Sequence, residues 1–292
     1  MIRVNRQVVK IEHFPDGTQC LMDVKLPENI NNDQHYFYIV WEYEGDEECM
    51  TLWYIVNHIR ANFPNPDIKL EMNYIPNARM DRVKSDKEVF TLKYFAKFIN
   101  SLSFSRVYVL DPHSDVSTAL FDNIVVSQPN SYIWVALREL TDGNGVVIYF
   151  PDAGAYKRYS DLPVFVNITC EKVYGQKERD WETGKIKGIR ILDKDGQPIE
   201  KDDPRIKGKK VLMIDDIISY GGTLAYSADK LKELGAGDIY AYASHTEPSV
   251  LDKEKGTLRK RLENGTVKRV FTTGSIFNTR KPYLVEKYFK VL

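Results

Sequence analysis

Two adjacent carboxylates and a glycine-containing loop lie together in the second half of the chain. Asp215 and Asp216 directly follow the apolar run 211–214, which has the composition of a buried strand. The loop after them opens a stretch of helical periodicity and consists of Ser219, Tyr220, Gly221, Gly222 and Thr223. Because open parallel sheets bind ligands at the carboxyl ends of their strands, this stretch predicts a ligand site.

The chemistry of this loop favours a phosphate ester. Gly221 and Gly222 allow backbone N–H groups to turn toward an anion, and the hydroxyls of Ser219 and Thr223 can add hydrogen bonds. The amino end of the following helix contributes the positive end of its dipole. The acidic pair would repel a phosphate but suits neutral vicinal hydroxyls. A pentose 5-phosphate carries both groups, so we predict a ligand of this kind.

The elements that must position this site alternate between short apolar strands and helical patterns. We predict strands at 68–75, 106–110, 146–150, 164–169, 210–214, 239–244 and 267–272, and helices at 50–63, 88–102, 223–234 and 251–263. Ser85 and Glu88 form a capping-box signature at the helix 88–102. About the first 45 residues predict short, partly antiparallel strands. The later alternation favours parallel sheets covered by helices.

The length of 292 residues favours two domains. The polar stretch 141–145 is the best boundary, so we predict domains at 1–142 and 143–292. A long polar segment, 172–208, lies within the second domain, and its first part is predicted to form a mobile hairpin. Polar loops of this length are usually functional, so we expect a flexible catalytic loop at about 172–190.

Composition excludes several classes of protein. The 41 Lys and Arg residues balance the 41 Asp and Glu residues, which argues against a nucleic-acid binder. The mean hydropathy is −0.40, and no apolar run approaches the ~18 residues of a membrane span. The charged amino terminus lacks the pattern of a secretory signal, so we expect a cytoplasmic protein. Three distant cysteines without a Cys-x-x-Cys pair predict reduced thiols and no zinc site.

Four further motifs resemble those of ribose-phosphate pyrophosphokinase, also called phosphoribosyl-pyrophosphate (PRPP) synthetase. They are Phe-Pro-Asp-Gly-Thr at 14–18, Tyr-Ile-Pro-Asn-Ala-Arg-Met-Asp-Arg at 74–82, Val-Leu-Asp-Pro-His-Ser at 109–114 and Pro-Asp-Ala-Gly-Ala-Tyr-Lys-Arg at 151–158. The stretch 211–223 is similar to the PRPP-binding fingerprint. The resemblance extends from about 14 to 276 and implies an α/β fold of two tandem phosphoribosyltransferase-like domains, each a mainly parallel sheet flanked by helices.

The resemblance implies a magnesium-dependent transfer of the diphosphoryl group of ATP to the anomeric hydroxyl of ribose 5-phosphate, giving PRPP and AMP. His113 and Asp152 match the residues that the family associates with Mg²⁺. The acidic pair and the loop 219–223 match its ribose 5-phosphate site. Lys157 and Arg158 follow Asp152 on a helix, and we expect solvated side chains there rather than catalytic ones.

The ATP site is implied by two motifs. Arg79 matches an arginine that binds ATP phosphates, and Asp81 lies in the same loop. Phe14 and Asp16 are expected to contact adenine, by stacking and by accepting a hydrogen bond. In the family this early loop serves a neighbouring subunit. The resemblance therefore implies a homo-oligomer, a dimer or larger, that shares the ATP site.

The catalytic cations are predicted on the polar segment. The family has a Lys-Arg-Arg run there, and Lys177 with Arg179 preserves a Lys-x-Arg spacing. Lys172 is the alternative, and a loop without catalytic function is a third interpretation. The phosphate loop departs from the family because it begins with Ser219 and Tyr220, where aspartate and a small hydroxyl residue are typical.

Two rival functions stay open at this point. A phosphoribosyltransferase that consumes PRPP would share the stretch 211–223, but such enzymes usually have one domain and lack the Arg79 and His113 motifs. A non-catalytic regulatory subunit associated with PRPP synthetase would keep the fold and lose catalytic-loop residues. Neither a Walker A motif nor a Gly-x-Gly-x-x-Gly fingerprint is present in the sequence.

Overall fold

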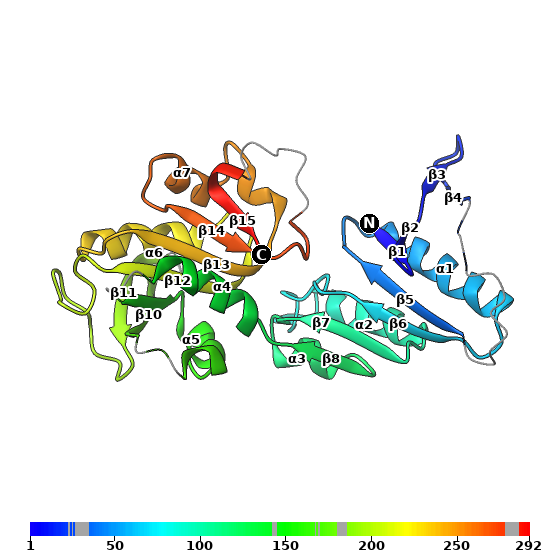
Figure 1. Cartoon of the computed structure of the whole chain (residues 1–292), viewed down its shortest axis with the longest axis horizontal. Helices are drawn as coiled ribbons and strands as arrows, with labels where there is room; N and C mark the ends of the chain where they lie inside the picture. The colour runs from blue at the N-terminus through cyan, green and yellow to red at the C-terminus, as the bar shows by residue number, and fades with distance from the viewer. Residues whose placement is uncertain are drawn as a thin grey trace. The chain divides into compact units, whose positions relative to one another are not determined.

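The computed structural model describes residues 1–22, 24, 26, 35–141, 145–166, 168, 170–179, 186–277 and 286–292, apart from the side chains of 178, 179, 186 and 187. Two compact units, Met1–Gln128 and Pro129–Leu292, each contain a sheet of their own (Figure 1). The division precedes helix α4 (Asn130–Leu140), whereas the sequence suggested a boundary at 142–143. Helix α4 belongs to the second unit because Ile133 and Leu137 are buried in its core.

The first unit contains a six-stranded sheet in the order β2-β1-β5-β6-β7-β8. Its strands are β1 (Ile2–Val4), β2 (Gln7–Val8), β5 (Tyr36–Trp41), β6 (Asp67–Glu71), β7 (Arg106–Leu110) and β8 (Ile124–Ser127). Strand β1 is antiparallel to β2 and β5, and the strands from β5 to β8 are parallel. This arrangement confirms the predicted change from antiparallel to parallel pairing.

One face of this sheet forms the core of the first unit. Alternate residues of β5, Phe37, Ile39 and Trp41, are buried, as the two-residue period of a strand requires. Helices α1 (Glu48–Asn62) and α2 (Thr91–Ser101) contribute buried leucine and isoleucine side chains to the same cluster. The intervening residues Tyr36 and Tyr38 are 57% and 38% exposed.

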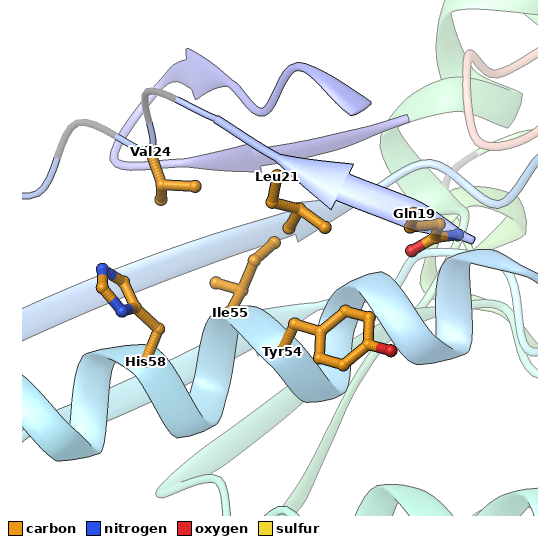
Figure 2. A pocket seen from close by; sticks show the side chains of 6 residues that line it. All are labelled: Gln19, Leu21, Val24, Tyr54, Ile55 and His58. Carbon is orange, nitrogen blue, oxygen red and sulfur yellow. The ribbon is translucent and has the colours of Figure 1, made fainter. Parts of the chain in front are cut away.

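A separate hairpin carries the early Phe14 motif. Strands β3 (Ile11–His13) and β4 (Gln19–Leu21) pair with each other and with no other described strand. Gln19 fastens the hairpin to α1: its Nε2 donates to the Glu47 carbonyl at 3.0 Å, and its Oε1 accepts from the Thr51 hydroxyl at 2.8 Å. A pocket of about 520 Å³ lies beside this attachment. Figure 2 shows the side chains that line it, which come mainly from β4 and α1.

The second unit contains a seven-stranded sheet in the order β11-β10-β9-β12-β13-β14-β15. Its strands are β9 (Val146–Phe150), β10 (Lys172–Arg179), β11 (Ile186–Asp193), β12 (Lys210–Ile218), β13 (Ile239–Thr246), β14 (Arg269–Thr272) and β15 (Phe289–Val291). All neighbours are parallel except β10 and β11. The antiparallel β10–β11 pair is the hairpin predicted from the polar segment, although residues 180–185 lie outside the described part.

Helices cover both faces of the second sheet. On one face, α4 and the region of α5 (Ala153–Tyr159) pack against Ile148, Leu212 and Tyr242. On the other face, α6 (Gly222–Glu233) and α7 (Thr257–Glu263) pack against Tyr149 and Met213. The predicted fold class, parallel sheets flanked by helices, is confirmed. Within the described part, no helix combines the length and hydropathy needed to cross a bilayer.

Two predicted elements are wrong. The apolar stretch 164–169 was predicted as a strand, but Pro163–Phe165 forms a 3₁₀ turn, η1, and Phe165 is buried against the sheet. The capping box of Ser85 and Glu88 does not cap a helix, because α2 begins only at Thr91. The Glu88 carboxylate instead accepts from the backbone N–H of Lys84 at 2.8 Å, which closes a local turn.

The attachment of the hairpin to α1 gives a first prediction. Thr51 is fully buried, and Thr51→Val keeps its shape while removing the donor to Gln19. A neutral hydrogen bond contributes about 1 kcal/mol, so we expect a small loss of global stability. Amide hydrogen exchange at 11–21 should become clearly faster, because this bond is one of two that hold Gln19.

Thr118→Val is a suitable control, since the Thr118 hydroxyl donates within its own short helix, α3 (Asp115–Ala119), to the Asp115 carbonyl at 2.9 Å. It should leave exchange in the hairpin unchanged. Equal exchange rates in wild type and Thr51→Val would show that other contacts hold the hairpin.

Candidate active site

Asp152 lies immediately beyond the carboxyl end of the central strand β9 and begins helix α5. Its Oδ1 accepts a hydrogen bond from the Ala155 N–H at 3.0 Å, the geometry of a helix N-cap. Its Oδ2 lies 3.8 Å from the Lys177 Nζ on β10. One carboxylate therefore joins the helix start to the hairpin.

The two candidate lysines of β10, Lys172 and Lys177, make different contacts. Lys177 reaches the carboxylate of Asp152 and is about one-quarter exposed. Lys172 donates to the Ser160 carbonyl at 2.6 Å, and its ammonium lies 5.3 Å from the ring centre of Phe165. These contacts give Lys172 a structural role. Arg179 ends β10, and its side chain lies outside the described part of the structure.

Asp215 and Asp216 lie within β12 rather than after it, which corrects the predicted strand end at 214. Strand β12 pairs with β9 only as far as Met213, then continues beside β13 to Ile218. The two carboxyl side chains interact with each other, and the Asp216 N–H donates to the Asp215 Oδ1 at 3.0 Å. The Asp216 Oδ2 lies 3.7 Å from the guanidinium of Arg158 on α5.

Arg158 is a residue whose role the sequence did not indicate. We expected a solvated side chain, but its guanidinium contacts the buried Asp216 and stacks at 5.0 Å over the Tyr159 ring. The contact joins α5 to β12, two elements far apart in the sequence. A helical spacing alone gives no signal for such a partner.

Burial raises the pKa of Asp215 well above its ordinary value. The negative charge of Asp216 raises this pKa further, and that of Asp152 adds a smaller effect. The folded protein thus holds carboxyl groups from two neighbouring strands close enough to interact. Neutral hydroxyls or a cation would suit such a place, and a phosphate would not.

The glycine loop after β12 has a shape that requires glycine at one position. Gly221 caps α6 with a φ of 78°, and a methyl group there would overlap the Cβ of Leu258. The Tyr220 carbonyl accepts hydrogen bonds from the Leu258 N–H at 3.2 Å and the Thr257 hydroxyl at 3.1 Å. Helix α7 thus supports the loop from behind.

The other loop residues stand at the start of the helix or beside it. The Ser219 hydroxyl lies 3.4 Å from that of Ser249. Gly222 and Thr223 are the first residues of α6, so the predicted helix start is correct within one residue. The N–H groups of this first turn have no partner within the helix, which makes the turn suitable for an anion.

In the first unit, the parallel strands β6 and β7 bring two predicted segments to one edge of the sheet. Arg79 and Asp81 lie in the loop after β6, and His113 follows β7. Pairing extends beyond the strands, since the Leu110 N–H donates to the Asn73 carbonyl at 3.1 Å. The His113 side chain is half-buried, and that of Arg79 is exposed.

Unusual backbone geometry marks both of these segments. Asn77 has a φ of 63° and Asp111 a φ of 44°, in the left-handed region. Asp111 also precedes a proline, a position that normally favours extended backbone. The same left-handed conformation occurs at other turns of the described chain, such as Asn65 and Asn123, so the role of the two loops stays a prediction.

Phe14 and Asp16 lie in the turn of the β3–β4 hairpin. The Phe14 ring is 54% exposed, as a stacking surface for a ligand would be. The Asp16 Oδ1 accepts hydrogen bonds from the Thr18 N–H at 3.0 Å and the Thr18 hydroxyl at 2.7 Å, and both lower the pKa of Asp16. Asp16 therefore shapes the turn as well as being a candidate ligand contact.

The predicted residues form one group in each unit. The second unit brings together Asp152, Lys177, the acidic pair and the glycine loop, and in the first unit the loops that carry Arg79, Asp81 and His113 follow two adjacent strands. Among the described residues, no three His, Cys, Asp or Glu side chains surround a common metal position. Magnesium does not need such a cage, because one or two carboxylates and substrate phosphates usually hold it.

The part of the chain that contains the site of the second unit matches a known protein family. Residues 121–275, just over half of the chain, match the model of the phosphoribosyl transferase domain. The chain belongs to this family. The matched region contains Asp152, Lys177, the acidic pair and the glycine loop, so the family domain coincides with the site in the second unit.

Curated relatives narrow the class within this family. A ribose-phosphate pyrophosphokinase of Saccharolobus solfataricus is 26% identical over 272 residues, 92% of this chain and 85% of the relative. One from Thermococcus kodakarensis is 28% identical over 238 residues, 81% of this chain and 77% of the relative. These matches confirm the predicted family and enzyme class, ribose-phosphate pyrophosphokinase.

A solved structure supports the fold. The phosphoribosylpyrophosphate synthetase of Mycobacterium smegmatis has a TM-score of 0.70 to this chain at 18% identity, covering 98% of this chain and 85% of its own. The agreement extends over both units. It confirms the predicted two-domain class of fold.

The raised pKa of Asp215 predicts how stability depends on pH. In the unfolded chain this carboxyl ionises near pH 3.8, whereas the folded protein keeps it protonated to higher pH. Wild-type stability therefore falls as pH rises from about 4 toward the folded pKa. Asp215→Asn lacks this loss, so urea unfolding should show the variant gaining stability over wild type between pH 4 and pH 7.

Asp252→Asn provides a control with a different pH dependence. Backbone N–H groups of Lys255 and Glu254 lower the pKa of Asp252, so the stability that its ionised form contributes is already present above about pH 4 and is lost only at lower pH. The stability difference between Asp252→Asn and wild type should therefore stay nearly constant between pH 4 and pH 7. A difference between Asp215→Asn and wild type that stays constant with pH would contradict the assignment of a raised pKa to Asp215.

Proposed function

We propose that this chain transfers the diphosphoryl group of ATP to the anomeric hydroxyl of ribose 5-phosphate, forming PRPP and AMP. The observation that carries the proposal is the 3.8 Å contact between Lys177 of the hairpin and Asp152 at the end of β9. It brings a loop cation next to a carboxylate suited to magnesium, in the same unit as a phosphate loop.

The ribose 5-phosphate is assigned to the second unit. Its phosphate would accept hydrogen bonds from the first-turn N–H groups of α6 and the hydroxyls of Ser219 and Thr223. Asp215 and Asp216 would bind the ring hydroxyls, since burial and mutual repulsion disfavour a second anion beside them. The pair thereby orients the sugar for reaction at its anomeric carbon.

The ATP is assigned to the loops of the first unit. The guanidinium of Arg79 can bind phosphate oxygens in a forked geometry, and the exposed ring of Phe14 can stack on the base. Asp81 and Asp16 are the candidate acceptors near these groups. Arg79 in the first unit, and Lys177 and Arg179 in the second, are each candidates for the fixed positive charge that phosphoryl transfer requires.

Magnesium is the metal that these residues suit best. The Asp152 Oδ2 is directed at a cation rather than at the helix cap, and carboxylate oxygen is the ligand that magnesium prefers. In the first unit, His113 is a separate candidate partner for a metal ion. A bound Mg²⁺ would neutralise phosphate charge. The residues of the chain would hold the substrates and position the anomeric hydroxyl.

The homo-oligomer and the cytoplasmic location stay predictions. The hairpin turn with Phe14 lies away from the Gln19 and Leu21 contacts that hold the hairpin to the rest of the unit, which suits a loop that reaches a neighbouring subunit. Size-exclusion chromatography with light scattering would test the oligomer directly. A monomer that retains full activity would remove the shared ATP site.

The function is tested by incubating the purified chain with ATP, ribose 5-phosphate and Mg²⁺ and measuring AMP and PRPP. We expect both products in equal amounts, and no reaction when EDTA removes the metal. Formation of neither product would favour the regulatory-subunit alternative. Consumption of added PRPP with a nucleobase, without PRPP synthesis, would favour a phosphoribosyltransferase.

Lys177→Ala should lower kcat by about 100-fold or more while the KM for ATP changes little, because a fixed cation acts mainly on the transition state. Lys172→Met is the matched control on the same strand. It removes the contact with the Ser160 carbonyl, so it should reduce stability and leave kcat near wild type. Unaltered turnover in Lys177→Ala would exclude Lys177 as the catalytic cation.

A further inference from the structure

Tyr149 lies on β9, three residues before Asp152, and has no solvent exposure. Its hydroxyl donates to the Ser227 Oγ on α6 at 2.8 Å. The Ser227 hydroxyl in turn donates to the Thr223 carbonyl at 2.8 Å, in the first turn of the same helix. A chain of two hydrogen bonds thus connects the central strand to the proposed phosphate loop.

The same hydroxyl lies against the strand that carries Lys177. A methyl group at Gly175 of β10 would overlap the Tyr149 hydroxyl and lie 2.7 Å from the Pro151 carbonyl. Glycine within a strand often marks such a close approach of two backbones or groups. Since side chains alternate along a strand, residues 173, 175 and 177 share one face, the face on which Tyr149 packs.

Tyr149 therefore contacts three parts of the site at once. It packs against β10 two residues before Lys177, lies on the strand that precedes Asp152, and its hydroxyl donates to the helix that begins at the phosphate loop. No other described side chain is hydrogen-bonded in this way between these elements. One buried side chain on β9 thus connects the elements that carry the proposed reacting groups.

We propose that Tyr149 is a positioning residue that sets the distance between the Lys177–Asp152 pair and the ribose-phosphate loop. This inference rests on the proposed function for its kinetic consequences. The hydroxyl acts by tying α6 and β10 to one point on β9, and it touches neither substrate. Gly175 is required by the same contact, because only a residue without a side chain lets the β10 backbone lie this close to the Tyr149 hydroxyl.

The hydroxyl is suited to holding position rather than to moving protons. Burial raises the pKa of Tyr149, and the charges of Asp152 and Asp215 raise it further, while the bond to Ser227 opposes this only in part. The group stays a neutral donor throughout the working pH range. The pH–rate profile should accordingly keep its shape when the hydroxyl is removed.

Tyr149→Phe is the direct test, because it keeps the ring and removes only the hydroxyl. Displacing reacting groups by 1 Å can cost about 100-fold in rate, and we expect a smaller shift to lower kcat by roughly tenfold. The KM for ATP should not change. Amide hydrogen exchange should quicken at 172–179 and 219–224 together, since both segments lose one common attachment.

Tyr242→Phe is the matched control. Tyr242 is also fully buried, on strand β13 of the same sheet, and its hydroxyl lies 3.1 Å from the Ser244 Oγ. It should lose similar stability, keep kcat, and leave exchange at the two segments unchanged. A double-mutant cycle adds Ser227→Ala. If the hydrogen bond acts as a unit, the double variant should be no slower than the slower single variant.

The outcomes separate this inference from the proposed function. Wild-type kcat in Tyr149→Phe, or an equal loss in Tyr242→Phe, would overturn the positioning role. If the wild-type chain forms neither AMP nor PRPP, the proposed function fails, and hydrogen exchange still decides the coupling. Faster exchange at only one of the two segments would show that Tyr149 does not connect them.

Discussion

Repulsion among three carboxylates is the constraint that organises the second unit. Asp152 follows β9, and Asp215 and Asp216 lie on the adjacent β12, where burial, the charge of Asp216 and, less strongly, that of Asp152 raise the pKa of Asp215. Each surrounding element places a cation or an N–H donor beside one of these carboxylates. The hairpin supplies Lys177, α5 supplies Arg158, and the first turn of α5 supplies a backbone N–H. A β10–β9–β12 strand order is what allows these partners to meet.

The sequence predicted what depends on neighbours in the chain. The apolar run, acidic pair and glycine loop before α6 form one continuous stretch, and its strand, loop and helix are all present. Asp152 as a helix start and the β10–β11 hairpin were predicted for the same reason. Local signals also misled, because in the apolar stretch 164–169 it is Phe165 that packs into the core, from a 3₁₀ turn rather than a paired strand.

Contacts between residues that are far apart in the sequence could not be predicted from local patterns. Arg158 is 58 residues before Asp216, and Tyr149 is 78 residues before Ser227, so neither partner has a sequence signal. Gly175 appeared only as one glycine in a polar segment, although its lack of a side chain decides how close β10 approaches β9. The choice between Lys172 and Lys177 likewise needed the observed contacts with Ser160 and Asp152.

The contact of Gly221 with Leu258 has a consequence for the thermodynamics of binding. Helix α7 occupies the space behind the loop and donates to the Tyr220 carbonyl, so the loop adopts its left-handed turn when the chain folds. A ligand then meets an ordered loop, and the conformational entropy of that segment is lost during folding rather than on association. Affinity for a small anion can be high at such a loop even though few atoms make contact.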